Sequence, residues 1–128
     1  MKYLVDTHAF LWLVFDDPRI SDRAVALLED PNNELWMSFA SIWEMSIKHS
    51  LGKLKFDQPF EEFVTEHVLG TQLDLLPIQM SHLLEVNQLP WHHRDPFDRI
   101  LAAQCKAEGF TLISNDRAFE GYGLDFVW

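Results

Sequence analysis

Five short apolar segments, which alternate with longer amphipathic ones, constrain the fold of this chain most strongly. Each is three or four residues long, and together they cover residues 2–5, 35–38, 73–76, 111–113 and 124–127. This length suits a buried strand, whereas a helix usually needs about ten residues or more. Because strands and helices alternate, the sequence predicts an α/β domain with a mainly parallel sheet of about five strands, which helices cover on both faces.

Helix signals fill the longer segments. Apolar residues with helical spacing predict helices over residues 7–15, 40–50, 59–68 and 80–86. Ser21 or Asp22 can cap a further helix. The clearest helix begins at Asp95, has Pro96 at its first helical position and ends at Gly109.

The length and composition of the chain fit a single globular domain over residues 1–128. Hydrophobic residues make up 48% of it, and no repeat, linker or low-complexity segment divides it. No apolar run is long enough to span a membrane, and acidic residues near the N-terminus interrupt any secretory signal. The only cysteine, Cys105, cannot form an intrachain disulfide. We therefore expect a cytoplasmic protein with no membrane partner.

The formal net charge of −10 restricts how the protein can handle nucleic acid. Broad basic surfaces bind nucleic acid because Lys and Arg side chains neutralise its phosphates, and this composition argues against that mode of binding. Bound divalent cations are another device, since they reverse the sign of the local field. A solvated acidic surface would also explain the charge, so the positions of the acids decide between the two interpretations.

Four acids follow the predicted strands at points where they can meet. Asp6 comes directly after the first strand, and Asp116 follows the fourth strand after two intervening residues. Glu44 and Asp98 lie near the first turns of helices that begin at the same edge. Because the carboxyl ends of parallel strands share one edge of the sheet, these carboxylates should converge there. Converging carboxylates resist ionisation unless cations lie among them, and such oxygen ligands suit Mg²⁺ or Mn²⁺.

Each acid also has a structural interpretation that the sequence leaves open. Asp6 and Asp95 can cap the helices that follow them. Glu44 can pair with Lys48 one turn later, and Asp116 can belong to a Ser-Asn-Asp turn. No single acid decides between these roles and metal binding, but the combination of all four favours a metal site.

Four segments of the chain resemble the motifs of the PIN domain family. They are Leu4–His8, Ser41–Met45, Arg94–Gln104 and Leu112–Asp116, and each carries one of the four acids. The segment Arg94–Gln104 resembles in particular a bacterial single-domain subgroup, the VapC-type toxin ribonucleases. The resemblance covers nearly the whole chain, from Met1 to about Phe119, with the motifs in the order of the family.

This resemblance implies a three-layer α/β/α PIN-like fold with a catalytic metal site. The residues that it assigns as catalytic metal ligands are Asp6, Glu44, Asp98 and Asp116. Thr7 and Ser114 match positions whose hydroxyl groups can orient a ligand or a metal-bound water. Asp95 matches an acid of the subgroup, and whether it reaches the metal stays open.

The activity that the resemblance implies is that of a Mg²⁺- or Mn²⁺-dependent endoribonuclease, in which the acids hold a metal-activated water for hydrolysis of RNA phosphodiester bonds. The implied setting is the toxin half of a type II, VapBC-type toxin–antitoxin pair, with a small antitoxin protein as partner and a homodimer as the oligomeric state. Two alternatives stay open. One is a PIN-fold protein-binding module without catalysis, and the other is a metal-dependent deoxyribonuclease, because acids do not recognise the 2′-hydroxyl.

Several basic residues lie close to the motif acids and are candidates for contact with the substrate. Lys48, Arg94, Arg99 and Arg117 all fall within four positions of such an acid. They either hold flanking phosphates or offset the acidic charge, and both interpretations stay open. His92 and His93 either contact RNA or belong to an ordinary exposed loop. A serine nucleophile is not expected, because the chain has no Gly-x-Ser-x-Gly motif.

Overall fold

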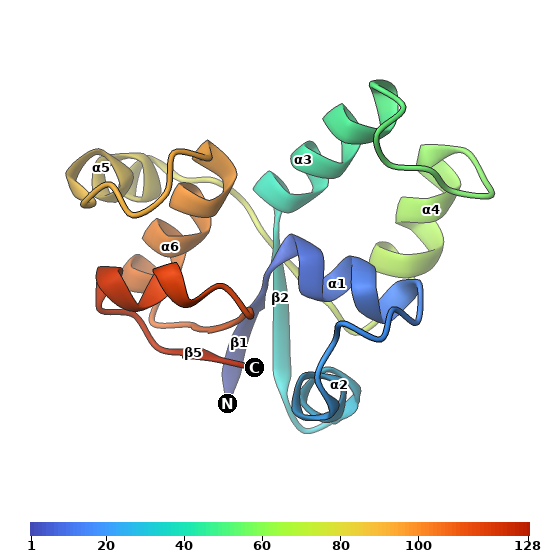
Figure 1. Ribbon diagram of the computed structural model, residues 1–128, viewed down its shortest axis with the longest axis horizontal. Helices are drawn as coiled ribbons and strands as arrows, with labels where there is room; N and C mark the ends of the chain where they lie inside the picture. The colour runs from blue at the N-terminus through green and yellow to red at the C-terminus, as the bar shows by residue number, and fades with distance from the viewer.

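The computed structural model describes residues 1–128 and places a five-stranded sheet between two layers of helices (Figure 1). The strands are β1 (Lys2–Val5), β2 (Glu34–Ser38), β3 (Asp74–Leu76), β4 (Thr111–Ile113) and β5 (Phe126–Val127). They lie in the order β3-β2-β1-β4-β5, and every neighbouring pair is parallel. The predicted three-layer α/β/α fold with a parallel sheet is therefore confirmed.

Helices of three kinds connect the strands. The α-helices are α1 (Thr7–Val14), α2 (Asp22–Glu29), α3 (Phe39–Ser50), α4 (Phe60–Val64), α5 (Met80–Gln88) and α6 (Pro96–Glu108). The π-helix η1 (Thr65–Leu69) continues α4, and the 3-10 helix η2 (Arg117–Tyr122) follows β4. The sequence pattern does not predict η2, because a helix of six residues shows too little periodicity. No helix combines the length and the apolar character needed to cross a membrane.

The helix predicted over residues 59–68 changes its geometry at Thr65. The Thr65 hydroxyl donates to the Glu61 carbonyl at 2.9 Å, and the Gly70 N–H donates to the Thr65 carbonyl at 2.9 Å. The first bond competes with the regular helical ladder, and the second spans the five residues of a π-turn. A helix is therefore present here as predicted, but its second half is wider than an α-helix.

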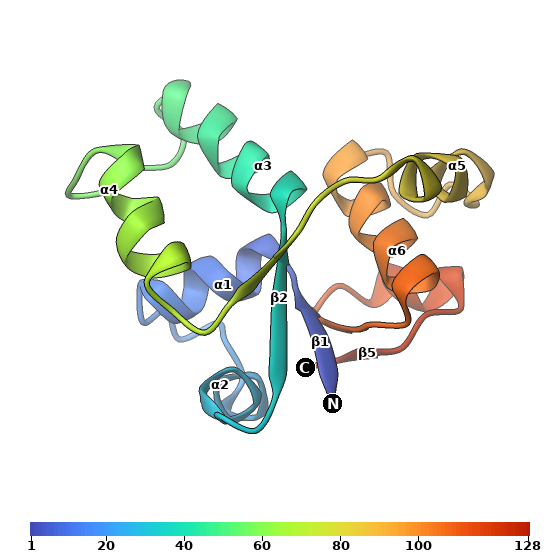
Figure 2. The ribbon, with the colours of Figure 1, turned by 180° about the vertical axis from the view of Figure 1, so that it is seen from behind.

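The two layers of helices pack against opposite faces of the sheet. The side chains of Tyr3 and Val5 on β1 join one core, which includes Phe10 from α1 and Phe63 from α4. Leu4, between them, joins a second core with α6 and η2. Figures 1 and 2 show the same division, with α1, α2 and α4 on one side of the sheet and α5 and α6 on the other. The last three residues of β1 are all buried, as expected for a parallel strand with both faces covered.

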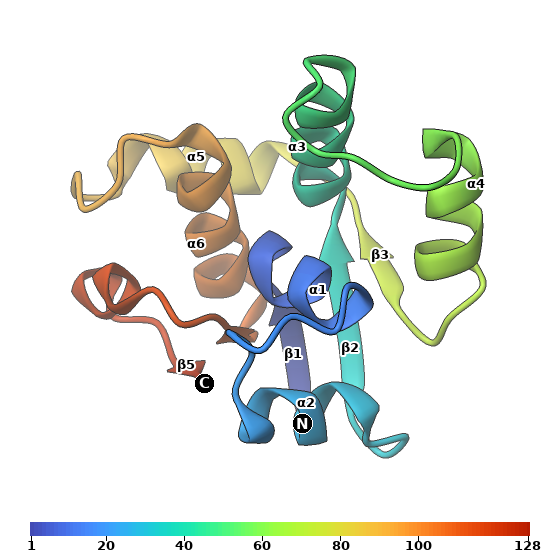
Figure 3. The same cartoon turned by 45° about the vertical axis from the view of Figure 1, so that its right-hand side comes forward.

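The chain reverses its direction across the sheet at the centre, between β1 and β4. It first builds β2 and β3 outward from β1 and then returns through α5 and α6 to β4, on the other side of β1. Val5 pairs with Ile113, and the Asp6 N–H donates to the Ile113 carbonyl at 3.1 Å. Figure 3 shows α1 and α3 leaving the carboxyl ends of β1 and β2 at this edge. Ligands of open α/β sheets bind at such a reversal, outside the carboxyl ends of the strands.

Arg99, which the sequence suggests as a contact for substrate, is buried and binds main-chain carbonyls. The residue is only 5% exposed, near the start of α6. Its guanidinium group donates to the carbonyls of Pro90 (2.9 Å), Val86 (3.1 Å) and Leu89 (3.3 Å). The Trp91 ring covers it, with 3.7 Å between the ring centre and the guanidinium carbon. Arg99 therefore satisfies buried carbonyls at the end of α5, and its contact with substrate stays a prediction that this burial does not favour.

Replacement of Arg99 by lysine is expected to lower the free energy of unfolding by about 2–3 kcal/mol, because one ammonium group cannot reach all three carbonyls and bonds to charged groups contribute roughly 1.5–3 kcal/mol each. Urea unfolding followed by circular dichroism measures the change. The matched control is Arg94→Lys at an exposed arginine nearby, for which about 0.5 kcal/mol or less is expected. Equal effects of the two substitutions would contradict the structural role of Arg99.

Candidate metal centre

Asp6 is a buried carboxylate at the carboxyl end of β1, only 5% exposed. Its Oδ1 accepts from the N–H groups of His8 (2.6 Å) and Ala9 (3.2 Å) and so caps α1, as one interpretation of the sequence predicts. Its Oδ2 accepts from the Ser114 hydroxyl at 2.6 Å. Burial raises the pKa of the Asp6 carboxyl, and these hydrogen bonds oppose the rise only in part. Burial therefore makes the ionised form of Asp6 less favourable than it is in water, and a nearby positive charge would offset that cost.

Ser114 joins two of the acids. Its hydroxyl donates to Asp6 and accepts from the Asp116 N–H at 3.1 Å, and the residue is fully buried. Thr7, the other hydroxyl expected near the ligands, instead donates to the Ser41 hydroxyl at 2.9 Å and so ties α1 to α3. Ser114 therefore orients a carboxylate directly, whereas Thr7 positions the helix that carries Glu44.

Glu44 is a buried acid on α3 that pairs with Lys48, one turn later on the same helix. The residue is 4% exposed, and its Oε2 lies 2.7 Å from the Lys48 Nζ. The pairing that the sequence left open is confirmed. The Lys48 side chain remains 40% exposed, but Glu44 already matches its charge. Lys48 therefore neutralises Glu44, and its charge is not free to bind a phosphate.

The carboxyl of Asp98, in the first turn of α6, is influenced by the charges of two other candidate ligands, Asp6 and Glu44. Burial is the main cause that raises the pKa of its carboxyl to about 6, and the negative charge of Asp95 adds to the rise. The charges of Asp6 and Glu44 add further contributions, while His93 lowers the pKa. Asp95 is exposed and caps α6 by accepting a main-chain N–H at 2.8 Å. Acids from separate segments of the chain therefore share one electrostatic field.

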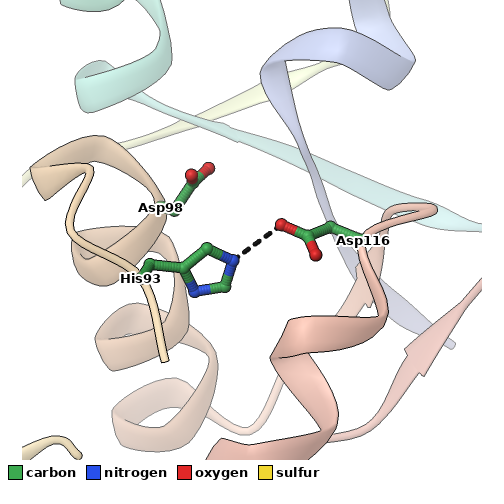
Figure 4. Close-up of side chains that lie close together, drawn as sticks. All are labelled: His93, Asp98 and Asp116. Carbon is green, nitrogen blue, oxygen red and sulfur yellow. Dashed lines mark hydrogen bonds and ion pairs between the residues drawn. The ribbon is translucent and has the colours of Figure 1, made fainter. Parts of the chain in front are cut away.

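A histidine that the motifs do not assign holds the fourth acid, Asp116. The His93 Nε2 lies 2.6 Å from the Asp116 Oδ2 (Figure 4), and its Nδ1 lies 2.8 Å from the Tyr122 hydroxyl. Because an ionised carboxylate only accepts, Nε2 donates to Asp116, while Nδ1 lies within hydrogen-bond distance of the Tyr122 hydroxyl. The His93 side chain is 8% exposed and packs against Phe119. It therefore belongs to the site and not to an ordinary exposed loop.

The donor atoms at this edge fit a divalent cation. The candidate ligand atoms of His93, Asp98 and Asp116 all lie within 4.8 Å of one another, and Figure 4 shows the three side chains converging. Asp6 lines the same cavity as Asp98 and Asp116. Carboxylate oxygens suit Mg²⁺ or Mn²⁺, and a positive charge here would relieve the repulsion that raises the pKa of Asp98.

The remaining basic candidates lie outside this cavity. Arg94 is exposed and lines a separate apolar hollow, and Arg117 is exposed and pairs with Glu120 at 3.0 Å. The basic residue that does line the acidic cavity is Arg19, beside Trp12. The sequence analysis misses Arg19, because this residue is far along the chain from every motif acid. The feature that indicates it is the turn signal before Arg19, which reverses the chain onto α1.

The sequence matches the PIN domain family over residues 3–123. A comparison with curated protein sequences finds no match. Solved structures that resemble the chain include VapBC2 from Rickettsia felis bound to a promoter DNA fragment, FitAcB from Neisseria gonorrhoeae and VapBC-1 from nontypeable Haemophilus influenzae. Their TM-scores are 0.74, 0.72 and 0.71, at sequence identities of 17%, 16% and 23%. The alignments cover 99%, 98% and 99% of this chain and 98%, 96% and 97% of the respective neighbours.

At these identities the structural likeness shows the fold alone. The family match, in contrast, is a match of the sequence itself. It spans nearly the whole chain and includes Asp6, Glu44, Asp98 and Asp116. The chain therefore belongs to the PIN domain family.

Proposed function

We propose that this protein is a divalent-metal-dependent endoribonuclease whose catalytic metal ligands are Asp6, Glu44, Asp98 and Asp116. PIN domains are nucleases, so the family supports hydrolysis of phosphodiester bonds. The observation that carries the proposal is that Asp6, Asp98 and Asp116 line one cavity at the centre of the sheet, where burial and the charges of neighbouring acids, Glu44 among them, raise the pKa of Asp98 to about 6. A cluster of this kind is costly unless a cation compensates it.

Mg²⁺ or Mn²⁺ is the cofactor that suits these ligands. When bound, such a cation supplies positive charge to the scissile phosphate and makes a coordinated water more acidic. The residues of the chain hold the carboxylates in place for it. Ser114 and the start of α1 hold Asp6, and His93 holds Asp116. The carboxylates therefore need little rearrangement when the cation and the substrate bind.

Residues around the ligands have separate roles in this proposal. Asp95 is exposed and occupied in capping α6, and its charge raises the pKa of Asp98, so we assign it an electrostatic role and not a place among the ligands. Arg94 and Arg117 are exposed near motif acids and remain candidates for flanking phosphates. Lys48 is assigned to Glu44.

We further infer that the protein is the toxin component of a type II toxin–antitoxin pair and acts in the cytoplasm. The support is the fold shared with chains of structures described as VapBC, at nearly full coverage of both chains. A small antitoxin protein is the partner that this role requires. The proposal includes a homodimer, for which Trp43 and Trp91 offer an exposed apolar surface beside a common hollow.

Substitution of a ligand acid is expected to abolish metal-dependent cleavage of RNA. The protein, freed of any co-purifying partner, is incubated with single-stranded and structured RNA in Mg²⁺, Mn²⁺ or EDTA. We expect Asp6→Asn and Asp98→Asn to lower the rate more than roughly 100-fold, since the loss of a residue that merely orients a ligand costs 10–100-fold. The matched control is Asp57→Asn, an exposed acid outside the cluster, which should keep the wild-type rate.

Other outcomes of this experiment have distinct meanings. Equal cleavage by the wild type and the ligand variants would identify a contaminating nuclease. Cleavage of DNA but not RNA by a folded, metal-binding protein would contradict the proposed substrate. Cleavage of neither nucleic acid would favour a protein-binding module without catalysis.

In the metal-free protein, the protonated Asp98 carboxyl contributes to the free energy of unfolding, and this contribution is expected to disappear as the pH rises through about 6. The folded-state pKa of about 6 lies above the ordinary value of 3.8, so this contribution is complete below pH 3.8 and is lost above pH 6. Asp98→Asn removes the cost, so in EDTA the difference in melting temperature between variant and wild type should be larger at pH 7.5 than at pH 5. Solvent screening of the half-buried side chain keeps the change to roughly a few degrees.

Circular dichroism melting curves at the two pH values measure this effect. Added Mn²⁺ should raise the melting temperature of the wild type more than that of Asp98→Asn, because the cation binds the folded state. A difference between variant and wild type that is the same at both pH values would contradict the electrostatic account of Asp98.

Removal of the His93 ring is expected to weaken Mn²⁺ binding about 10- to 100-fold, because Asp116 loses the partner that orients it. His93→Gln can still donate to Asp116 and should recover part of the affinity lost in His93→Ala, and Tyr122→Phe should have a smaller effect. Electron paramagnetic resonance of free Mn²⁺ measures the affinity without any cleavage assay. His92→Gln is the control. Unchanged Mn²⁺ affinity with lowered stability would show that His93 only packs the loop.

A further inference from the structure

The cavity that holds the acids has a second set of lining residues, which metal binding does not use. Its volume of about 430 Å³ falls within the range of roughly 300–1,000 Å³ that is typical of ligand sites. Three of the acids account for part of the lining, and the rest consists of His8, Trp12, Arg19 and Asn115. This cavity can therefore hold more than a cation.

The backbone holds Arg19 over Trp12. Helix α1 places His8 and Trp12 one turn apart on the same face, with 5.9 Å between their ring centroids. The chain then reverses at Asp16, whose φ of 53° lies in the left-handed region, and the Asp17 N–H donates to the Trp12 carbonyl at 2.8 Å. This reversal leaves the guanidinium carbon of Arg19 only 4.7 Å from the centre of the Trp12 ring.

Asp17 fixes the guanidinium group of Arg19 and neutralises its charge. Nε donates to both carboxylate oxygens, and Nη2 donates to Oδ2 at 2.7 Å, while Nη1 has no partner in the protein. The Arg19 side chain is 66% exposed. An unpaired cation would suit a phosphate, whereas this paired group offers mainly a flat exposed plane. Nucleobases stack on guanidinium planes and on aromatic rings.

We propose that His8, Trp12 and Arg19 form a base-stacking subsite for a nucleotide adjacent to the scissile phosphate. The inference rests on the proposed ribonuclease function: the acidic part of the cavity faces the phosphate, and this part holds the neighbouring base. The base has to be unpaired, because a base inside a duplex has no free face. The ligand is therefore single-stranded RNA, with only a modest preference of sequence, since every base has a face that can stack.

Binding to RNA without cleavage tests this subsite in an Asp98→Asn background. Fluorescence anisotropy of a labelled single-stranded RNA gives Kd for Trp12→Ala, Trp12→Phe and Arg19→Ala. We expect Trp12→Ala to raise Kd about 5- to 100-fold, the effect of losing one stacked base, and Arg19→Ala to raise it roughly threefold or more. Trp12→Phe keeps an aromatic face and should stay near the parent. Arg23→Ala is the matched control, because its side chain is exposed and lies outside this cavity.

Abasic nucleotides, placed in turn at each position of the same RNA, locate the stacked base. The parent protein should lose affinity when the abasic nucleotide stands at one particular position. Trp12→Ala should show no additional loss of affinity at that position, because it already lacks the ring on which the base stacks.

If folded Trp12→Ala and Arg19→Ala bind every RNA as tightly as the parent, the subsite is overturned, while RNA cleavage by the wild type leaves the ribonuclease proposal intact. If the wild type neither binds nor cuts RNA, both proposals are overturned. Arg19 is exposed, so Arg19→Ala and the abasic scan decide the matter even where Trp12→Ala does not fold.

Discussion

The orientation of one buried carboxylate, Asp6, is the constraint on which the rest of the site depends. Its two oxygens act in different directions: one caps α1, and the other binds Ser114 just beyond β4. These bonds lock the ends of the two central strands together and set the direction in which α1 leaves the sheet. Because burial opposes the ionisation of Asp6, the site stores unfavourable electrostatic energy, which the two hydrophobic cores on either side of the sheet offset.

Structural and chemical roles of the acids are not alternatives in this protein. Asp6, Asp95 and Asp116 each accept a main-chain N–H at the start of a helix, and Glu44 accepts from Lys48. From the sequence alone, these helix caps and this ion pair are alternatives to metal binding. In the structure they instead restrain the carboxylates that would bind the metal. A restrained side chain loses less conformational entropy when a ligand arrives. The same hydrogen bonds that stabilise the helix starts therefore organise the candidate metal centre in advance.

The fold and the meeting of the acids follow from features that act over short distances in the sequence. Apolar runs mark the strands, and an acid directly after a strand marks the edge where ligands bind. Contacts between distant segments do not follow in this way: the bond from His93 to Asp116 and the stacking of Arg19 on Trp12 both depend on turns that bring a loop against another element. Arg99 shows the same limit, because the general preference of arginine for the surface fails where its guanidinium group satisfies buried carbonyls.

The pairing of β1 with β4 also affects the order in which the protein can become active during its synthesis. Asp6 and Ser114 are 108 positions apart, so all six α-helices leave the ribosome before the first acid meets its hydroxyl partner. Until then β1 lacks one of its two neighbours, and the contacts that close the centre are among those of greatest sequence separation, which form late in folding. An unfinished chain therefore has no assembled centre. In the proposed ribonuclease, this topology would delay activity until nearly all of the chain that the proposed antitoxin has to recognise has been synthesised.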